Sequence, residues 1–149
     1  MNESLIIQSN IVNLPYVEER LFHFCSECNV GNYYSTVSMA VLQAVERAIS
    51  CDEELSKTDN ILIEMGNCRG GVFFEVKGAA PVFVISETVA KNNYPDDKSF
   101  FIIKSLSDRM FLSDDGKSIR LEFDVNGIDP ADALERVSVV QSHFMLEAA

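Results

Sequence analysis

The chain has 149 residues, of which 47% are hydrophobic, and it carries a net charge of −11 with a pI near 4.5. This length is enough for one domain with a hydrophobic core, and the apolar content is too high for a disordered chain. The acidity argues against nucleic-acid binding, because a phosphate backbone repels acidic surfaces, whereas a protein partner with a basic patch stays compatible.

The sequence also argues against a membrane protein. No apolar run approaches the roughly 18–20 residues that a membrane-spanning helix needs. The first ten residues, MNESLIIQSN, lack both the basic region and the long apolar segment of a signal peptide. We therefore expect a cytoplasmic protein with no membrane contact, whose cysteines are reduced thiols.

The N-terminal segment predicts a strand followed by a helix. Residues Ser4–Ser9 have the composition of a strand. Asn13 is a suitable helix cap and Pro15 suits a first turn, so a helix is expected to begin there. It should end near Asn29, because Gly31 provides a stop signal.

A second helix is predicted to follow, capped by Asn32 or Ser35 and ending at about Ser50. Its apolar residues recur at helical spacing, which predicts that it is well buried. These residues are Val37, Val41, Ala44, Val45 and Ala48.

The first helix contains the pair Cys25 and Cys28, whose C-x-x-C spacing also occurs in redox and zinc sites. Both cysteines continue the apolar stripe of that helix, which favours a role as small core side chains. No second C-x-x-C or H-x-x-x-H accompanies them as a metal site would require, and redox sensing remains a weaker alternative.

The middle of the chain predicts a loop and a hairpin. The acidic segment 51–60 has the composition of a solvated loop. Strands are expected at Ile61–Met65 and Val72–Val76, separated by the glycine-containing turn GNCRGG. Residues Val82–Ile85 either extend the sheet or begin another turn, and 86–98 are polar and expected to form a loop.

The last third predicts a short apolar helix at Phe100–Leu106 and a hairpin of Arg109–Ser113 with Ser118–Asp124, joined around Asp115-Gly116. A final helix is expected after Asp129 as cap and Pro130 at its first position. Its apolar stripe is Ala133, Val137, Val140 and Phe144.

This order of elements predicts an α+β fold: a two-layer sandwich in which helices cover one face of a mixed, mostly antiparallel sheet. Three segments of it resemble the histidine-kinase-like ATPase fold, and within that fold the anti-sigma-factor serine/threonine kinases. The segments are Val37–Ser50, Gly71–Phe83 and Ser99–Phe123, the last with the motifs L-x-D at Leu106–Asp108 and L-x-F at Leu121–Phe123. The resemblance implies an ATPase-type domain at residues 1–124 and a C-terminal helical extension at 125–149.

The resemblance also implies where chemistry would occur. In such kinases a glutamate on the second helix acts as general base, and an asparagine one turn later binds Mg²⁺. The matching residues here are Gln43 and Arg47, with Glu46 and Ser50 as the alternative register. A neutral amide is a poor proton acceptor, and an arginine places a permanent cation where the metal would bind.

Two further family motifs are also altered. In the family motif D-x-G-x-G the aspartate hydrogen-bonds adenine, and the matching residues are Gly78, Ala80 and Val82, so no side-chain acceptor is present for the base. The glycine pair that approaches phosphate corresponds to Asp97 and Ser99. A carboxylate at that place would repel phosphate.

We therefore expect a degenerate, kinase-like module that works by protein contact, with no catalytic residue, no metal and no cofactor. The resemblance implies a sigma factor, an anti-anti-sigma protein or a second copy as partner. The C-terminal helix would pack either across such a dimer or on its own domain. The alternatives are an active ATP- and Mg²⁺-dependent serine/threonine kinase with Glu46 as base, and binding of an anion or nucleotide without metal by Arg47 with Lys77 or Lys98.

Overall fold

The computed structural model describes residues 2–52, 60–85, 97–125 and 135–142. Within them, five strands form one sheet in the order β1-β2-β3-β5-β4, and every neighbouring pair is antiparallel. The strands are β1 (Asn2–Gln8), β2 (Asn60–Cys68), β3 (Gly71–Lys77), β4 (Arg109–Leu112) and β5 (Ser118–Phe123).

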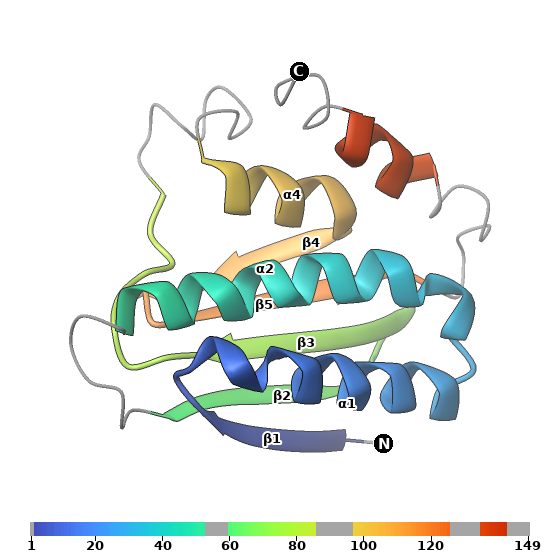
Figure 1. The fold of residues 1–149 in the computed structure, drawn as a ribbon. Coiled ribbons are helices and arrows are strands. Elements are labelled where there is room, and N and C mark those ends of the chain that lie inside the picture. The colour runs from blue at the N-terminus through green and yellow to red at the C-terminus, as the bar shows by residue number, and fades with distance from the viewer. Residues whose placement is uncertain (1, 53–59, 86–96, 126–134, 143–149) are drawn as a thin grey trace.

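Three helices lie together on one face of this sheet (Figure 1). They are α1 (Leu14–Glu27), α2 (Tyr34–Asp52) and α4 (Lys98–Leu106), with short 3-10 turns at Ile11–Asn13 and Gly31–Tyr33. The predicted α+β two-layer sandwich with helices on one face is confirmed, and in the described part of the chain its sheet is antiparallel throughout.

The core lies between these two layers. From α2 it receives several small side chains, which allow the helix to approach the sheet closely. The fully buried side chains of α2 include Val37, Ala40, Val41, Ala44 and Val45, and those of the sheet include Ile61, Ile63, Phe74, Val76, Ile119 and Leu121.

Two helix boundaries differ from the sequence prediction. Asn13 does not cap α1 with its side chain, because its Nδ2 donates to the Gln8 carbonyl instead, at 3.0 Å. The side chain of Asn10 caps the preceding 3-10 turn by accepting from the Val12 amide at 3.1 Å. At the other boundary, α2 continues through Asp52, so the segment predicted as a loop from residue 51 begins as helix.

The β2–β3 hairpin is tighter than predicted, because both strands extend to a turn at Gly70, whose φ of 90° favours glycine. Gly71 follows, and a Cβ there would lie 1.8 Å from the Phe123 carbonyl oxygen on β5. Residues Val82–Ile85 do not extend the sheet.

The C-terminal region is helical at residues 135–142, where Val137 and Val140 are buried as part of the common core. Arg136 donates to Asp108 at 3.2 Å, which attaches this helix to the start of β4. The described part of the C-terminal helix therefore packs on its own domain. The predicted cap Asp129, with Pro130, Ala133 and Phe144, lies outside the described residues.

Candidate functional site

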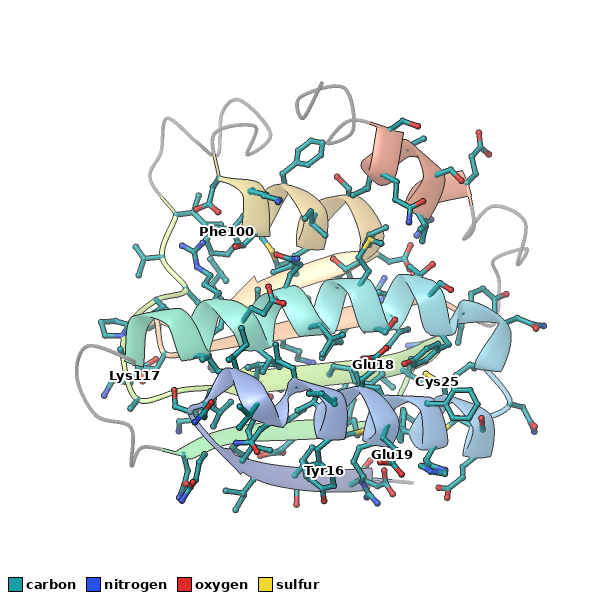
Figure 2. All side chains as sticks on the ribbon, in the orientation of Figure 1. Tyr16, Glu18, Glu19, Cys25, Phe100 and Lys117 are labelled. Carbon is teal, nitrogen blue, oxygen red and sulfur yellow. The ribbon has the colours of Figure 1, made fainter. Side chains whose placement is uncertain are left out.

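The residues that the resemblance assigns to nucleotide and metal fall on α2, on the segment after β3 and on the start of α4. The helices α2 and α4 pack side by side, and Phe100 lies between them, fully buried (Figure 2). Because the apolar face of α2 packs into the core, Gln43, Glu46 and Arg47 lie around the outer side of this helix.

Arg47 makes the most extensive contacts of this set. Its Nε donates to the Val82 carbonyl at 2.7 Å, and its Nη1 donates to both carboxylate oxygens of Asp97, at 2.9 and 3.2 Å. Its guanidinium carbon lies 4.1 Å above the centroid of the Phe100 ring, in cation–π geometry. The Arg47 and Asp97 side chains are 21% and 24% exposed, so the ion pair is largely removed from water.

Asp97 has a second task at the same place. Its Oδ1 accepts a hydrogen bond from the Phe100 amide at 3.3 Å, so that it caps the N-terminus of α4. A carboxylate at a helix N-terminus also interacts favourably with the helix dipole. Asp97, at the position of the expected phosphate-binding glycine, thus places its own carboxylate at the N-terminus of α4. The same carboxylate neutralises the charge of Arg47.

The segment after β3 is fixed by backbone contacts. The Gly78 amide donates to the Lys117 carbonyl at 3.0 Å, and the Phe83 amide donates to the Gly116 carbonyl at 2.8 Å. Ala80 is buried, and Val82 holds Arg47 through its carbonyl oxygen. These positions therefore connect α2 to the β4–β5 turn, and Val82 takes part through its backbone.

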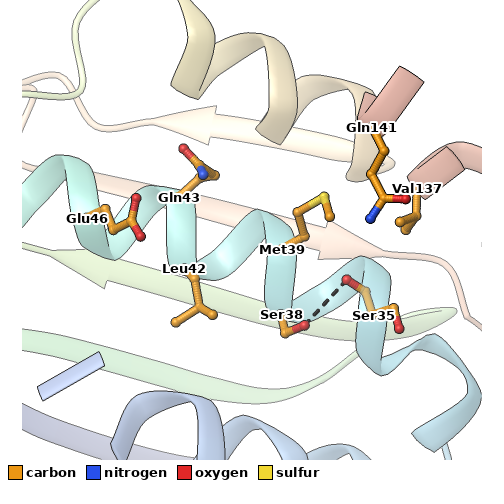
Figure 3. A pocket seen from close by; sticks show the side chains of 8 residues that line it. All are labelled: Ser35, Ser38, Met39, Leu42, Gln43, Glu46, Val137 and Gln141. Carbon is orange, nitrogen blue, oxygen red and sulfur yellow. Dashed lines mark hydrogen bonds between the residues drawn. The ribbon is translucent and has the colours of Figure 1, made fainter. Parts of the chain in front are cut away.

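Gln43 does not accompany Arg47, although it lies one turn earlier on the same helix. It lines a shallow groove of about 390 Å³ between α2 and the C-terminal helix, together with Glu46 (Figure 3). The opposite side of the groove is formed by Val137 and Gln141 (Figure 3). Among the described residues that line this groove, Glu46 is the one titratable side chain, and the side chain of Ser50 lies outside the described residues.

The remaining candidates differ in their exposure to solvent. Ser99 is half-buried in the first turn of α4, and Lys77 and Lys98 are exposed. Cys25 is fully buried on α1, where burial raises the pKa of its thiol to about 12. Burial also raises the pKa of Cys28. Both thiols are therefore protonated at neutral pH, which suits a packing role more than metal binding or redox chemistry.

Sequence reasoning assigned Arg47 and Asp97 separately but did not pair them. Their opposite charges at two positions of one expected site are the signal that could have predicted the contact. Phe100 and the Val82 carbonyl were missed because an aromatic ring on an apolar stripe and a backbone oxygen carry no sequence signal of their own.

Within the described ranges, no cluster of three or more histidine, cysteine, aspartate or glutamate side chains could hold a metal ion. In the same ranges, none of the helices is both long and apolar enough to cross a membrane. No protein-family model matches the sequence, and a search of curated proteins finds no significant match.

Proposed function

We propose that this chain is a regulatory, protein-binding module of the anti-sigma-factor type, acting in the cytoplasm without binding ATP and Mg²⁺ in the way of the kinases it resembles. The observation that supports the proposal is the ion pair of Arg47 with Asp97. It occupies the place where the resemblance would put metal and phosphate. Its partner would be a sigma factor, an anti-anti-sigma protein or a second copy.

The ion pair opposes nucleotide binding in two ways. Arg47 already directs donors at two oxygen-bearing partners, so an incoming phosphate would have to displace the Asp97 carboxylate. Separating a largely buried ion pair leaves an uncompensated charge, which costs about 3–5 kcal/mol when the pair is fully buried. Mg²⁺ would in addition approach a fixed guanidinium cation, and like charges repel strongly at short distance.

The test is the melting temperature with ATP or ADP, with and without Mg²⁺. A ligand at 100 times its dissociation constant would add about 2.7 kcal/mol, which corresponds to a rise of roughly 5–10 °C for a chain of this size. We expect no rise in any of the four conditions.

Each alternative has its own outcome in this experiment. A rise that requires Mg²⁺ would contradict the proposal and favour an active kinase. A rise without Mg²⁺ that the variant Arg47→Met abolishes would favour metal-free binding of a nucleotide at Arg47. Arg69→Met is the matched control, because Arg69 is exposed and lies far along the chain from both helices.

A further inference from the structure

The outer face of α1 combines exposed apolar side chains with carboxylates. Among the described residues, eight large hydrophobic side chains are exposed, and four of them lie on α1 or on the 3-10 turn directly before it. These four are Ile11, Val12, Tyr16 and Phe22. Such a concentration on one short segment is typical of a binding surface, whereas single exposed apolar residues are ordinary.

The carboxylates on the exposed surface of α1 border both aromatic side chains. Glu18, Glu19 and Glu27 are exposed, and Figure 2 shows Glu18 on the side of α1 toward α2 and Glu19 with Tyr16 on the side toward β1. Glu19 lies 3.8 Å from His23, which is charged only when protonated. Arg20, on the same helix, is directed to Glu3 of β1 at 3.3 Å. The charge of this face is therefore negative at neutral pH.

One of the two aromatic side chains, Phe22, is held in place before any partner arrives. On the opposite side of α1, Val17, Leu21 and Phe24 are fully buried, which fixes the helix on the sheet. The Phe22 ring packs edge-on against Tyr34 with 5.4 Å between ring centroids, and the Tyr34 hydroxyl donates to the Glu18 carbonyl at 3.3 Å. Aromatic residues held in this way lose little conformational entropy on binding.

We propose that the outer face of α1 is the docking surface for a basic, amphipathic helix of a protein partner; this rests on the proposed function as a protein-binding module. Charge complementarity selects the occupant. Lysines or arginines of the partner would face Glu18, Glu19 and Glu27, and its apolar side chains would cover Tyr16 and Phe22, which are 49% and 52% exposed. A second copy would bring the same carboxylates together, and nucleic acid would bring phosphates against them.

The spacing along α1 also suits a helix. Tyr16 and Phe22 are six residues apart, which is about 9 Å along the helix axis and about 120° around it. They therefore lie on the two flanks of the exposed surface of α1, with Glu19 between them. A partner helix lying over Glu19 would contact one ring with each edge of its apolar face. Basic residues on its flanks would then reach the carboxylates between and beside the two rings.

The probe for this surface is a fluorescently labelled, 18-residue amphipathic helical peptide of lysine and leucine, followed by anisotropy. A peptide of the same pattern with glutamate in place of lysine is the control ligand. We expect the basic peptide to bind, its affinity to fall as salt is raised, and the acidic peptide not to bind. Amide shifts in a ¹⁵N spectrum should map to Ile11–Glu27.

Two variants separate this surface from non-specific charge attraction. The variant E18Q/E19Q/E27Q and the matched control E64Q/E75Q/E135Q both change the net charge from −11 to −8, since each removes three carboxylates (−11 + 3 = −8). We expect at least a threefold loss of affinity for the first and no change for the control. Y16S/F22S should lose at least tenfold, and a circular dichroism melt verifies that it is folded.

The inference is wrong if both triple variants weaken binding equally, if the peptide does not bind, or if the shifted amides lie outside α1. These outcomes leave the proposed function standing as long as nucleotide fails to raise the melting temperature. A nucleotide-dependent rise contradicts the proposed function whatever the peptide does. The two failures are therefore distinguishable.

Discussion

Two arginines, Arg47 and Arg109, each hold carboxylate oxygens, but they lie in different surroundings. Arg47 joins α2 to Val82, 35 residues away, and to Asp97, 50 residues away, in a place that is largely closed to water. Arg109 on β4 joins Glu122 and Asp124, which are only 13 and 15 residues away, with its side chain 40% exposed.

The two arginines differ in whether the segments that they join are already held together by backbone hydrogen bonds. The strands β4 and β5 are already paired by backbone hydrogen bonds, and the charges around Arg109 are screened by solvent. By contrast, Arg47 connects α2 with the segment after β3 and with the start of α4, which share no strand pairing with it. A partly buried ion pair thus joins segments that are distant in the sequence, whereas an exposed one strengthens an edge that backbone pairing has already formed.

The largest effect is expected for Arg47→Ala. The substitution leaves the Asp97 carboxylate partly buried without its cation, so the free energy of unfolding should fall by about 2–3 kcal/mol. Urea unfolding followed by circular dichroism measures it. The control Arg69→Ala, at an exposed arginine with no ion pair among the described residues, should stay within about 0.5 kcal/mol of the wild type. Equal losses for both variants would show that the contacts of Arg47 add no more stability than an exposed arginine without an ion pair does.

A smaller effect separates the two tasks of Asp97. Asparagine caps helices about as well as aspartate, so Asp97→Asn should lose the ion pair and keep the hydrogen bond to the Phe100 amide. Asp97→Ala should lose both, and the two variants should differ by about 1 kcal/mol in the same urea experiment. If they are equally stable, Asp97 contributes nothing as a cap.

The smallest effect at neutral pH is expected for Arg109→Met, and it should grow in acid. Hydrogen bonds from Arg109 hold the pKa values of Glu122 and Asp124 below their ordinary range. A lowered folded-state pKa stabilises the protein above the unfolded pKa, near 4, and this contribution is lost as the pH falls through the folded value. The wild type should therefore lose more stability than the variant between pH 7 and pH 3.

The pH series is measured by urea unfolding at each pH, with Lys104→Met as the control that should follow the wild type, because Lys104 is exposed on α4, away from Glu122 and Asp124. Parallel curves for wild type and Arg109→Met would show that this arginine does not set the titration of Glu122 and Asp124.

The parts of the fold that sequence reasoning predicted well are those with local causes. The Asp115-Gly116 turn was predicted because glycine tolerates a positive φ, and Gly116 has a φ of 71° in the structure. The strand at Arg109 and the helix ending at Leu106 agree to within a residue at those boundaries. The prediction failed where the sequence changes gradually in composition and has no residue that stops a helix. The acidic composition after Ser50 did not stop α2, which continues to Asp52.

The candidate site was predictable as a set of positions but not as an arrangement. The sequence identified Gln43, Arg47 and Asp97 as the residues at expected catalytic and phosphate positions. It could not show that Gln43 turns to a groove under the C-terminal helix while Arg47 turns to Asp97. Neighbouring positions on one helix differ by 100° per residue, so small differences in packing decide which side chains meet.

By itself, then, the sequence determined the order of helices and strands, the apolar faces that form the core and the residue types at the positions of the candidate site. These follow from spacing, turn chemistry and residue type, which act over a few residues. Only the tertiary structure decided that Arg47 and Asp97 neutralise each other across 50 residues, and that the described part of the C-terminal helix packs on its own domain. Contacts of that range depend on how two packed layers bring distant segments together, because an ion pair gains its energy from proximity and burial rather than from either residue alone.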